Sequence, residues 1–346
     1  MANVGPLIRP TTRAQYLAGT VNVPSNLFSH SDQIQQAQAG NGSGGGTGWA
    51  GRTADEVQPL NGASRFPASL SMSGQALFCS GNVVTSASLL PGFDLTADGM
   101  RVWPATAQAA RLKGLQEVLA LDKGVALVQA ANNVRVDAAS LNALLTTNGG
   151  GGAALATVFP TTSLGSQLKQ VAQIIELRPS TGMRRQVFFT AIGGFDTHSA
   201  QSWQQWDLLR QVGDAMAAFD AATIELGVSQ QVTSFTQSDF GRTLQPSGTG
   251  SDHGWGNHHL LMGGPVRGGD VYGSFPFPAL GGPSDATGRG ALIPGVSLEQ
   301  FGATLARWFG VNTANLGAVF PNLGNFAVSD LGFLSWRPVR AVLRRY

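Results

Sequence analysis

The most constraining feature of this sequence is the stretch 186–259, in which short apolar runs alternate with polar, glycine-bearing turns. Two runs rich in β-branched and aromatic residues, 187–192 and 232–236, each lead into such a turn. Between the two runs, apolar residues recur at helical spacing (Trp203, Trp206, Leu209, Val212, Met216, Phe219 and Leu226). This order of strand, loop, helix and strand predicts a parallel α/β sheet, whose site lies at the carboxyl ends of the strands.

Histidines are concentrated in the polar loops that follow these two strands. The chain has 5 histidines, and His198, His253, His258 and His259 all fall in these loops, while His30 lies in an earlier polar turn. The loops also carry Asp196, Asp239, Asp252 and Arg242. Cys79 is the single cysteine, so an intrachain disulfide and a multi-thiolate metal site are excluded. We therefore expect a metal or catalytic site, with zinc, manganese or calcium held by the following candidate ligands: Asp196, His198, Asp239, Asp252 and His253.

The same residues also have simpler interpretations. The three aspartates can be Asx-turn or helix-cap residues, and the histidines can be loop residues that only form hydrogen bonds. Arg242 can bind an oxyanion through its forked guanidinium, or it can pair with Asp239. His258 and His259 can be metal ligands, partners of ligands, or packing residues. Residue spacing alone leaves these alternatives open.

Composition limits the class of protein. With 346 residues and 42% apolar residues, the chain can bury the core of one large α/β domain. Only 12% of the residues are charged, the formal net charge is +2, and no Lys/Arg stripe is interleaved with aromatic residues, so nucleic acid is not an expected partner. The sequence has no run of 18 apolar residues and no secretory signal pattern at its start, so we expect no membrane span.

Outside this central stretch, the sequence predicts several further elements. Residues 67–103 alternate and carry turn signals, which favours short antiparallel strands or a small subdomain. Residues 105–147 are predicted to be helical, with one apolar stripe (Leu112, Leu115, Val118, Leu119 and Leu121). Ser163 is expected to cap the next helix, and residues 296–309 form an amphipathic helix that is capped by Ser297 and ends at Gly310. Ser29 or Ser31 is expected to cap a short helix at 32–39.

Several motifs together resemble one family. The segments GGFDTHSAQ, SDFGRT and SDHGWGNHHLLMGGPVRGGDVYG, with FSHSDQ and TGWAGR earlier, are similar to the signature of the domain of unknown function 1501 family, which is distantly similar to sulfatases and alkaline phosphatases. The resemblance covers almost the whole chain. It implies an alkaline phosphatase/sulfatase-like three-layer sandwich with a mostly parallel central sheet. We expect a single domain over residues 1–346, with a small inserted subdomain at 60–105.

The resemblance also implies an activity, namely metal-dependent hydrolysis of a small-molecule phosphate or sulfate ester. Ser29, with Ser31 as the alternative, matches the position of the nucleophile at a helix N-terminus, although Ser29 can equally be a plain N-cap. His30 joins the catalytic set, and Arg242 is expected to stabilise the transition-state oxyanion. Asp239 matches the superfamily's later metal-binding aspartate, while Phe240 replaces the neighbouring histidine. The alternative function is an exported binding or assembly protein with a degenerate site, or an inactive truncated member.

A bacterial periplasmic or extracellular location is a further implication of the resemblance. Members of the family usually begin with an export signal, often of the twin-arginine type, followed by a first strand that ends in a Gly-Gly-Asn-Asp-like turn. Residues matching these two features are not seen before the ANVGPLIRPTTRAQY segment at the start of this sequence. From the resemblance we therefore expect the domain to be incomplete at its N-terminal side.

Overall fold

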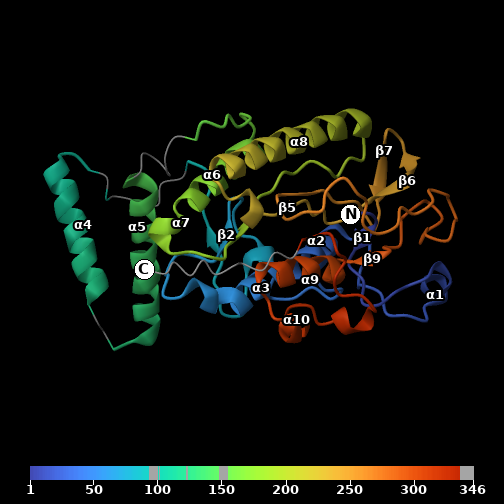
Figure 1. Cartoon of the computed structure of the whole chain (residues 1–346), viewed down its shortest axis with the longest axis horizontal. Helices are drawn as coiled ribbons and strands as arrows, with labels where there is room; N and C mark the ends of the chain where they lie inside the picture. Colours follow the sequence, from blue (N-terminus) through green and yellow to red (C-terminus); the bar gives the residue numbers. More distant parts are fainter. Residues whose placement is uncertain (93–99, 101, 122–123, 148–154, 336–346) are drawn as a thin grey trace, which may run out of the picture.

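The computed structural model describes residues 1–92, 100, 102–121, 124–147 and 155–335. Its short strands lie between two groups of helices (Figure 1). The side chains of strand β4 (Val187–Phe189) contact both groups of helices, because successive side chains of a strand point to opposite faces. Phe188 packs with helices α6 (Ser163–Glu176) and α8 (Gln201–Glu225). Val187 and Phe189 pack on the other side, with α3 (Trp49–Val57) and α9 (Leu298–Phe309).

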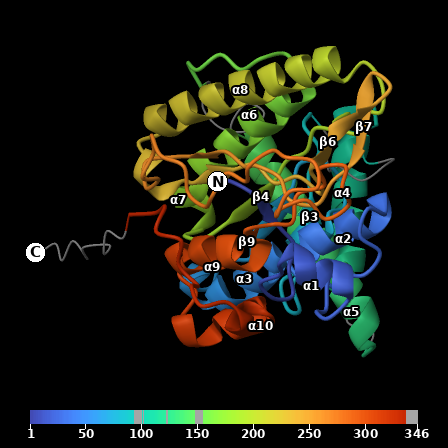
Figure 2. The ribbon, with the colours of Figure 1, turned by 90° about the vertical axis from the view of Figure 1, so that its right-hand side faces the viewer.

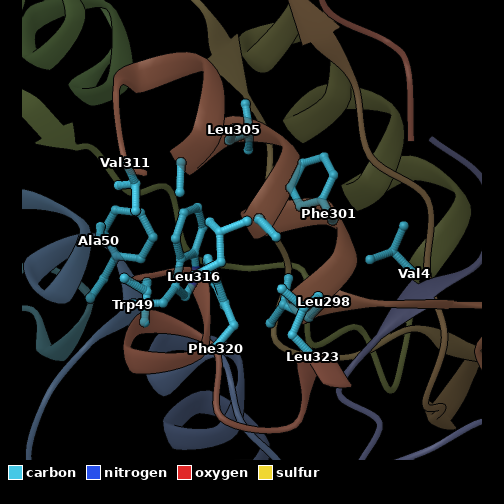
Figure 3. Close-up of a cluster of buried hydrophobic side chains, with 14 of the residues drawn as sticks. Val4, Trp49, Ala50, Leu298, Phe301, Leu305, Val311, Leu316, Phe320 and Leu323 are labelled. Atoms are coloured by element: carbon cyan, nitrogen blue, oxygen red, sulfur yellow. The ribbon is translucent and has the colours of Figure 1, made fainter. Parts of the chain in front are cut away.

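Of the two hydrophobic clusters on either side of β4, the one that includes α9 is the larger. Trp49, Phe301 and Phe320 are buried in it (Figure 3). The rings of Trp49 and Phe78 meet edge to face with centroids 4.9 Å apart. Helix α10 (Leu316–Val319) contributes Leu316 and Val319 to the same cluster. Figure 2 shows α3, α9 and α10 on one side of the strands and α6 and α8 on the other.

The ends of α9 are those that the sequence predicts. The Ser297 hydroxyl accepts a hydrogen bond from the Glu299 amide (3.1 Å), and the Ser297 amide donates to Gln300 Oε1 (3.0 Å), which forms a capping box. The helix ends at Gly310, whose φ of 123° favours glycine. For α6, by contrast, the predicted cap is wrong by one residue, because Thr162 Oγ1, and not Ser163, accepts the hydrogen bond from the Gly165 amide.

The strands form several small sheets. Strands β3 (Ala87–Ser88), β2 (Ser69–Ser71) and β4 make a parallel three-stranded sheet in that order, and β1 (Val4–Gly5) pairs in parallel with β9 (Val296–Ser297). Strands β5 (Ser234–Phe235) and β8 (Leu261–Met262) pair antiparallel, as do β6 (Arg242–Ser247) and β7 (Gly250–His253). The structure is thus a mixed α/β fold with small parallel and antiparallel sheets.

The expected antiparallel pairing within residues 67–103 is wrong. Strand β2 runs parallel to both of its neighbours, and all three of its residues are buried. A strand that is covered on both faces is typical of a parallel sheet between helices, and two or three residues are too few for their alternation to show this in the sequence. Residues 93–99 and 101 of this stretch lie outside the described part.

The remaining elements lie around this centre. Helices α4 (Ala105–Ala120) and α5 (Ala126–Thr147) confirm the predicted helical stretch and stand at one end of the molecule (Figure 1). No residue of α4 is buried, so its apolar stripe is not part of the core. The other elements are α1 (Arg13–Ala18), α2 (His30–Ala39), α7 (Arg178–Thr181) and the 3-10 turns Gln58–Asn61, Leu77–Cys79, Ser229–Gln231, Thr313–Asn315 and Leu323–Asn325. Among the residues described, no helix combines the length and apolar content needed to cross a membrane.

Candidate metal centre

One loop and one β-hairpin bring the predicted site residues together. The first follows β4 and carries Asp196 and His198; its start is held by Gln167 of α6, which exchanges two 2.9 Å hydrogen bonds with the Ala191 backbone. The second element is the β6–β7 hairpin, in which Arg242 and His253 are cross-strand partners. The loop packs so closely on Gly250 of this hairpin that an added Cβ there would lie 2.2 Å from the His198 carbonyl carbon. The glycine therefore allows the two elements to meet.

Asp196, His198 and His253 each place one potential ligand atom in the same small region. The Nε2 atoms of His198 and His253 each lie 2.9 Å from the same oxygen, Asp196 Oδ1. The three ligand atoms all lie within 4.8 Å of one another. Ligands at about 2.0–2.2 Å from one ion are separated by about 3–4 Å, so a small rearrangement of these side chains would accommodate one. Three of the five predicted ligands therefore fit a single ion.

The outer nitrogens of both imidazoles also have partners. His253 Nδ1 lies 3.1 Å from the Phe28 carbonyl oxygen, which directs the Nδ1 proton to that carbonyl and leaves Nε2 free as a ligand. His198 Nδ1 lies 3.7 Å from Asp252 Oδ1. Asp252 thus faces the side of His198 that points away from Asp196. This placement suits a carboxylate beside a ligating histidine better than it suits a fourth ligand.

Phe28 has an unusual backbone conformation at this contact. Its φ is 74°, in the left-handed region that bulky residues seldom adopt. Ala200, which directly precedes α8 and follows the His198 loop, has a φ of 48°. Strained residues of this kind concentrate at functional sites. Here, the conformation of Phe28 aims its carbonyl oxygen at His253.

Arg242 is fully engaged with the protein itself. Its Nη1 donates to Asp196 Oδ1 (2.6 Å), its Nη2 donates to the carbonyl oxygens of Thr197 (2.9 Å) and Ser251, and its Nε donates to Ser251 Oγ (3.2 Å). The expected alternative pairing with Asp239 is not seen. Burial raises the pKa of Asp196, but the hydrogen bond from Arg242 and the nearby imidazoles outweigh burial and hold this pKa below its usual range. Asp196 is therefore an anion at neutral pH.

The start of α2 lies beside the cluster. His30 Nε2 is 3.9 Å from Asp196 Oδ2, and the His30 and His253 ring centroids are 5.6 Å apart. Ser29 occupies the N-cap position but its hydroxyl makes no cap hydrogen bond. Instead, Ser29 Oγ donates to Asp32 Oδ2 at 2.5 Å, and Ser31 Oγ lies 3.4 Å from Ser29 Oγ. Ser29 thus caps α2 in position only, and its hydroxyl is oriented by Asp32.

Asp239 is not part of the three-residue cluster. Burial raises the pKa of Asp239, and the charge of His30 opposes this shift, which places Asp239 in the neighbourhood of His30. The adjacent Phe240 is buried, and its ring stacks on that of His253 with centroids 4.2 Å apart. Phe240 therefore packs against a candidate metal ligand.

His258 and His259 have packing roles. His258 Nδ1 accepts a hydrogen bond from the Asn3 amide (3.0 Å), and its ring stacks on Phe275. His259 is buried against Phe301, and burial lowers its pKa to about 3. Of the alternatives that the sequence left open for these two histidines, packing is the one that fits.

One charged residue of the site was missed by sequence reasoning. Arg289 Nη1 lies 2.6 Å from Asp252 Oδ2, and Arg289 lines a cavity of about 340 Å³ with Phe28, His198, Thr243, Asp252, His253 and Thr287. Arg289 lies 37 positions beyond Asp252 in a glycine-rich loop, and no motif marks it. The only signal in the sequence is an isolated arginine between two glycines.

The family of the chain follows from comparison with known proteins. The model of the family described as "Protein of unknown function (DUF1501)" matches residues 3–323. Neither the curated proteins nor the solved structures gave a match. The match includes the loop that carries Asp196 and His198, the β6–β7 hairpin and the Arg289 loop. The chain belongs to the DUF1501 family.

Proposed function

We propose that this protein is a metal-dependent hydrolase of phosphate or sulfate esters, with a site related to those of sulfatases and alkaline phosphatases. The observation that carries the proposal is the convergence of His198 Nε2 and His253 Nε2 on Asp196 Oδ1. The position of Asp196 and His198 after a parallel strand, β4, agrees with the way α/β folds build their sites. Export to a periplasmic or extracellular location is part of the same proposal and rests on the family resemblance alone.

The donor set indicates which ion the site prefers. Two imidazole nitrogens and one carboxylate oxygen suit zinc or manganese, whereas calcium binds almost entirely through oxygen. Such an ion would act as a Lewis acid on the negative charge that develops on the ester group. Asp239, near His30, is the candidate for extending the set.

Other residues of the chain would position the ligands, attack the ester and transfer the proton. Arg242 fixes Asp196 and keeps it ionised, while the Phe28 carbonyl and Asp252 orient the two imidazoles. Ser29 is the candidate nucleophile. The hydrogen bonds from Ser29 and Asn26 lower the pKa of Asp32, so Asp32 stays ionised and positions the hydroxyl; His30, beside Asp196, is the better candidate for proton transfer. Because every nitrogen of Arg242 is already engaged, its expected contribution to oxyanion stabilisation is its positive charge.

A second candidate function, a binding or assembly protein with a degenerate site, is favoured by one observation. Arg242 Nη1 lies 2.6 Å from Asp196 Oδ1 and neutralises its charge, so the cluster also fits an ion-pair network that only joins the Asp196 loop to the β6–β7 hairpin. The two functions differ in whether the cluster binds a metal ion and whether the protein hydrolyses esters.

The test is metal content and turnover in the same preparation. We expect the purified protein to retain zinc or manganese after dialysis and to hydrolyse 4-nitrophenyl phosphate or 4-nitrophenyl sulfate. His198→Gln combined with His253→Gln should lose the metal, whereas His258→Gln, a histidine outside the cluster, should retain it. Metal binding that is equal in both variants, or no turnover of either ester by the metal-loaded protein, would contradict the proposal.

The nucleophile is tested separately. Ser29→Ala should abolish turnover without loss of metal, and Ser31→Ala should leave most of the turnover intact. The reverse pattern would assign the attack to Ser31.

A further inference from the structure

The cavity beside the candidate metal centre contains an arginine that the hydrolase proposal does not use. Arg242 and Arg289 both lie near the cluster, but they differ in availability. The side chain of Arg242 is 12% exposed and donates from all three of its nitrogens to protein acceptors. The side chain of Arg289 is 46% exposed, and its recorded partner among the described residues is Asp252. Arg289 therefore has donors to offer to a ligand.

The loop that carries Arg289 is held rigidly. The buried carboxylate of Asp285 accepts hydrogen bonds from the amides of Gly281, Thr287 and Gly288, at 2.8–3.0 Å. The loop also docks on β6, because the Gln245 amide donates to the Arg289 carbonyl oxygen (3.0 Å). A Cβ on Gly290 would lie 2.4 Å from Leu244 Cβ, which shows how closely the two pack. The backbone of Arg289 is thus fixed while its side chain remains free to reorient.

The surroundings of the Arg289 guanidinium indicate the class of ligand. The cavity is lined by Phe28, two threonines and the two histidines of the cluster, and Asp252 is the one acidic residue of this lining. The carboxylate of Asp252 already binds the guanidinium through one oxygen. An oxyanion of a ligand can bind the guanidinium in the same way. An incoming oxyanion can replace this partner, because a guanidinium presents a fork of donors to such groups.

The position of Arg289 distinguishes it from the reacting centre. Asp252 lies on the Nδ1 side of His198, while Nε2 of the same ring points to Asp196. Arg289, held by Asp252, is therefore on the far side of the imidazole from the candidate metal position. We propose that Arg289 forms a second anion-binding site, which recognises an oxyanion group of the substrate other than the ester that is cleaved. The assignment of this oxyanion to a substrate rests on the proposed function, whereas the anion-binding site itself does not.

The first experiment measures anion binding without catalysis. Inorganic phosphate and inorganic sulfate are titrated calorimetrically into protein that has been freed of metal with a chelator. We expect millimolar or tighter binding to the wild type, weakened about ten- to a hundredfold in Arg289→Gln and less in Arg289→Lys, which keeps the charge but loses the fork. Arg9→Gln, at an exposed arginine near the N-terminus, is the matched control and should bind as the wild type does.

Asp252→Asn provides the opposite change. It removes the carboxylate that competes for Arg289, so binding of phosphate or sulfate should become tighter. Wild-type affinity in Arg289→Gln, weaker binding in Asp252→Asn, or no binding by the wild type in the millimolar range would each overturn the proposal.

The second experiment separates the two possible sources of the anion. Phenyl phosphate is compared with 2-carboxyphenyl phosphate as a substrate of the metal-loaded protein. Arg289→Gln should raise KM for the carboxylated ester alone, with kcat nearly unchanged. An equal loss for both esters would overturn the assignment to a second group and place the reacting phosphate on Arg289. Failure of the hydrolase proposal appears differently, as absence of metal binding and turnover while Arg289-dependent phosphate binding persists.

Discussion

Asp196 is the residue on which most of the candidate site converges. Arg242, His198 and His253 all contact the same oxygen of its carboxylate, at 2.6–2.9 Å. Only one of these partners, Arg242, also ties the Asp196 loop to the β7 backbone, through Thr197 and Ser251. The arrangement therefore depends on a single guanidinium more than on either imidazole.

Removing that guanidinium should be costly. For Arg242→Gln we expect a fall in the free energy of unfolding of about 1–3 kcal/mol, because the partly exposed carboxylate of Asp196 and two carbonyl oxygens lose their donor. Urea unfolding of the variant and the wild type at pH 7 measures this change in the free energy of unfolding. Arg210→Gln is the control, since Arg210 pairs with Asp207 and Asp214 on the exposed face of α8 and its loss should change stability by less than about 1 kcal/mol. Equal effects of the two substitutions would show that Arg242 does not hold the site together.

Two helical glycines, one in α3 and one in α8, show how closely elements pack against one another. Gly51 lies in α3, and an added Cβ there would be 2.1 Å from the backbone carbon of Ser80. Gly213 lies in the middle of α8, and an added Cβ would have nothing within 4 Å. Both are helical glycines, so the same substitution separates tertiary packing from helix propensity.

We expect opposite signs for the two alanine variants. Gly213→Ala should raise the free energy of unfolding by about 0.5–1 kcal/mol, because alanine favours the helix. Gly51→Ala should lower it by about 1–3 kcal/mol or more, since α3 must move away from the 77–81 segment. Thermal and urea unfolding of both variants decide it, and a stabilised Gly51→Ala would show that α3 is not packed as described.

The elements also show which parts of the fold the sequence can specify. The α9 cap at Ser297, the stop at Gly310 and the long helix before β5 are local patterns, and all are confirmed. The pairing of β2 was not predictable, because a three-residue strand carries little periodicity and its partner β4 lies more than 100 residues away. Strand propensity therefore predicted short strands in the 67–103 stretch, but it indicated neither the partners of β2 nor its direction.

The candidate site divides in the same way. Loop composition identified Asp196, His198 and His253, which the structure brings together. For Arg242 it left open either binding of an oxyanion or pairing with Asp239, and it did not indicate the observed partner Asp196, which lies on a different loop from the β6–β7 hairpin. It gave no indication of Arg289 or of the Phe28 carbonyl, since neither an isolated arginine nor a backbone oxygen leaves a pattern in a single sequence.

At the scale of the whole molecule, two buried ionisable groups should shape stability against pH. Burial raises the pKa of Glu299 to about 7 despite the hydrogen bonds from Asn322 and the charge of Arg52, and burial lowers the pKa of His259 to about 3. The Glu299 contribution falls as pH rises from the unfolded value, about 4.5, towards 7. The His259 contribution falls as pH drops below its unfolded value, about 6.5. Between about pH 4.5 and 6.5 the two contributions change with pH in opposite directions, so their slopes cancel.

Single substitutions should separate these two slopes. From pH 4.5 to 6.5, His259→Gln should lose stability relative to the wild type, and Glu299→Gln should gain it, each by about 1.4 kcal/mol per pH unit. Urea unfolding across this range measures the slopes independently of any constant offset that the substitutions cause. Parallel curves for the wild type and both variants would mean that neither group has the shifted pKa.

The proposed chemistry depends on one ion-sized site between the loop after β4 and the β6–β7 hairpin. Diffraction from crystals grown with zinc, with data collected on both sides of the zinc absorption edge, tests it most directly. We predict one strong anomalous peak with His198 Nε2, His253 Nε2 and an Asp196 oxygen at about 2.0–2.2 Å. A map with no zinc among these three side chains, or with zinc held only by residues elsewhere, would contradict the central claim.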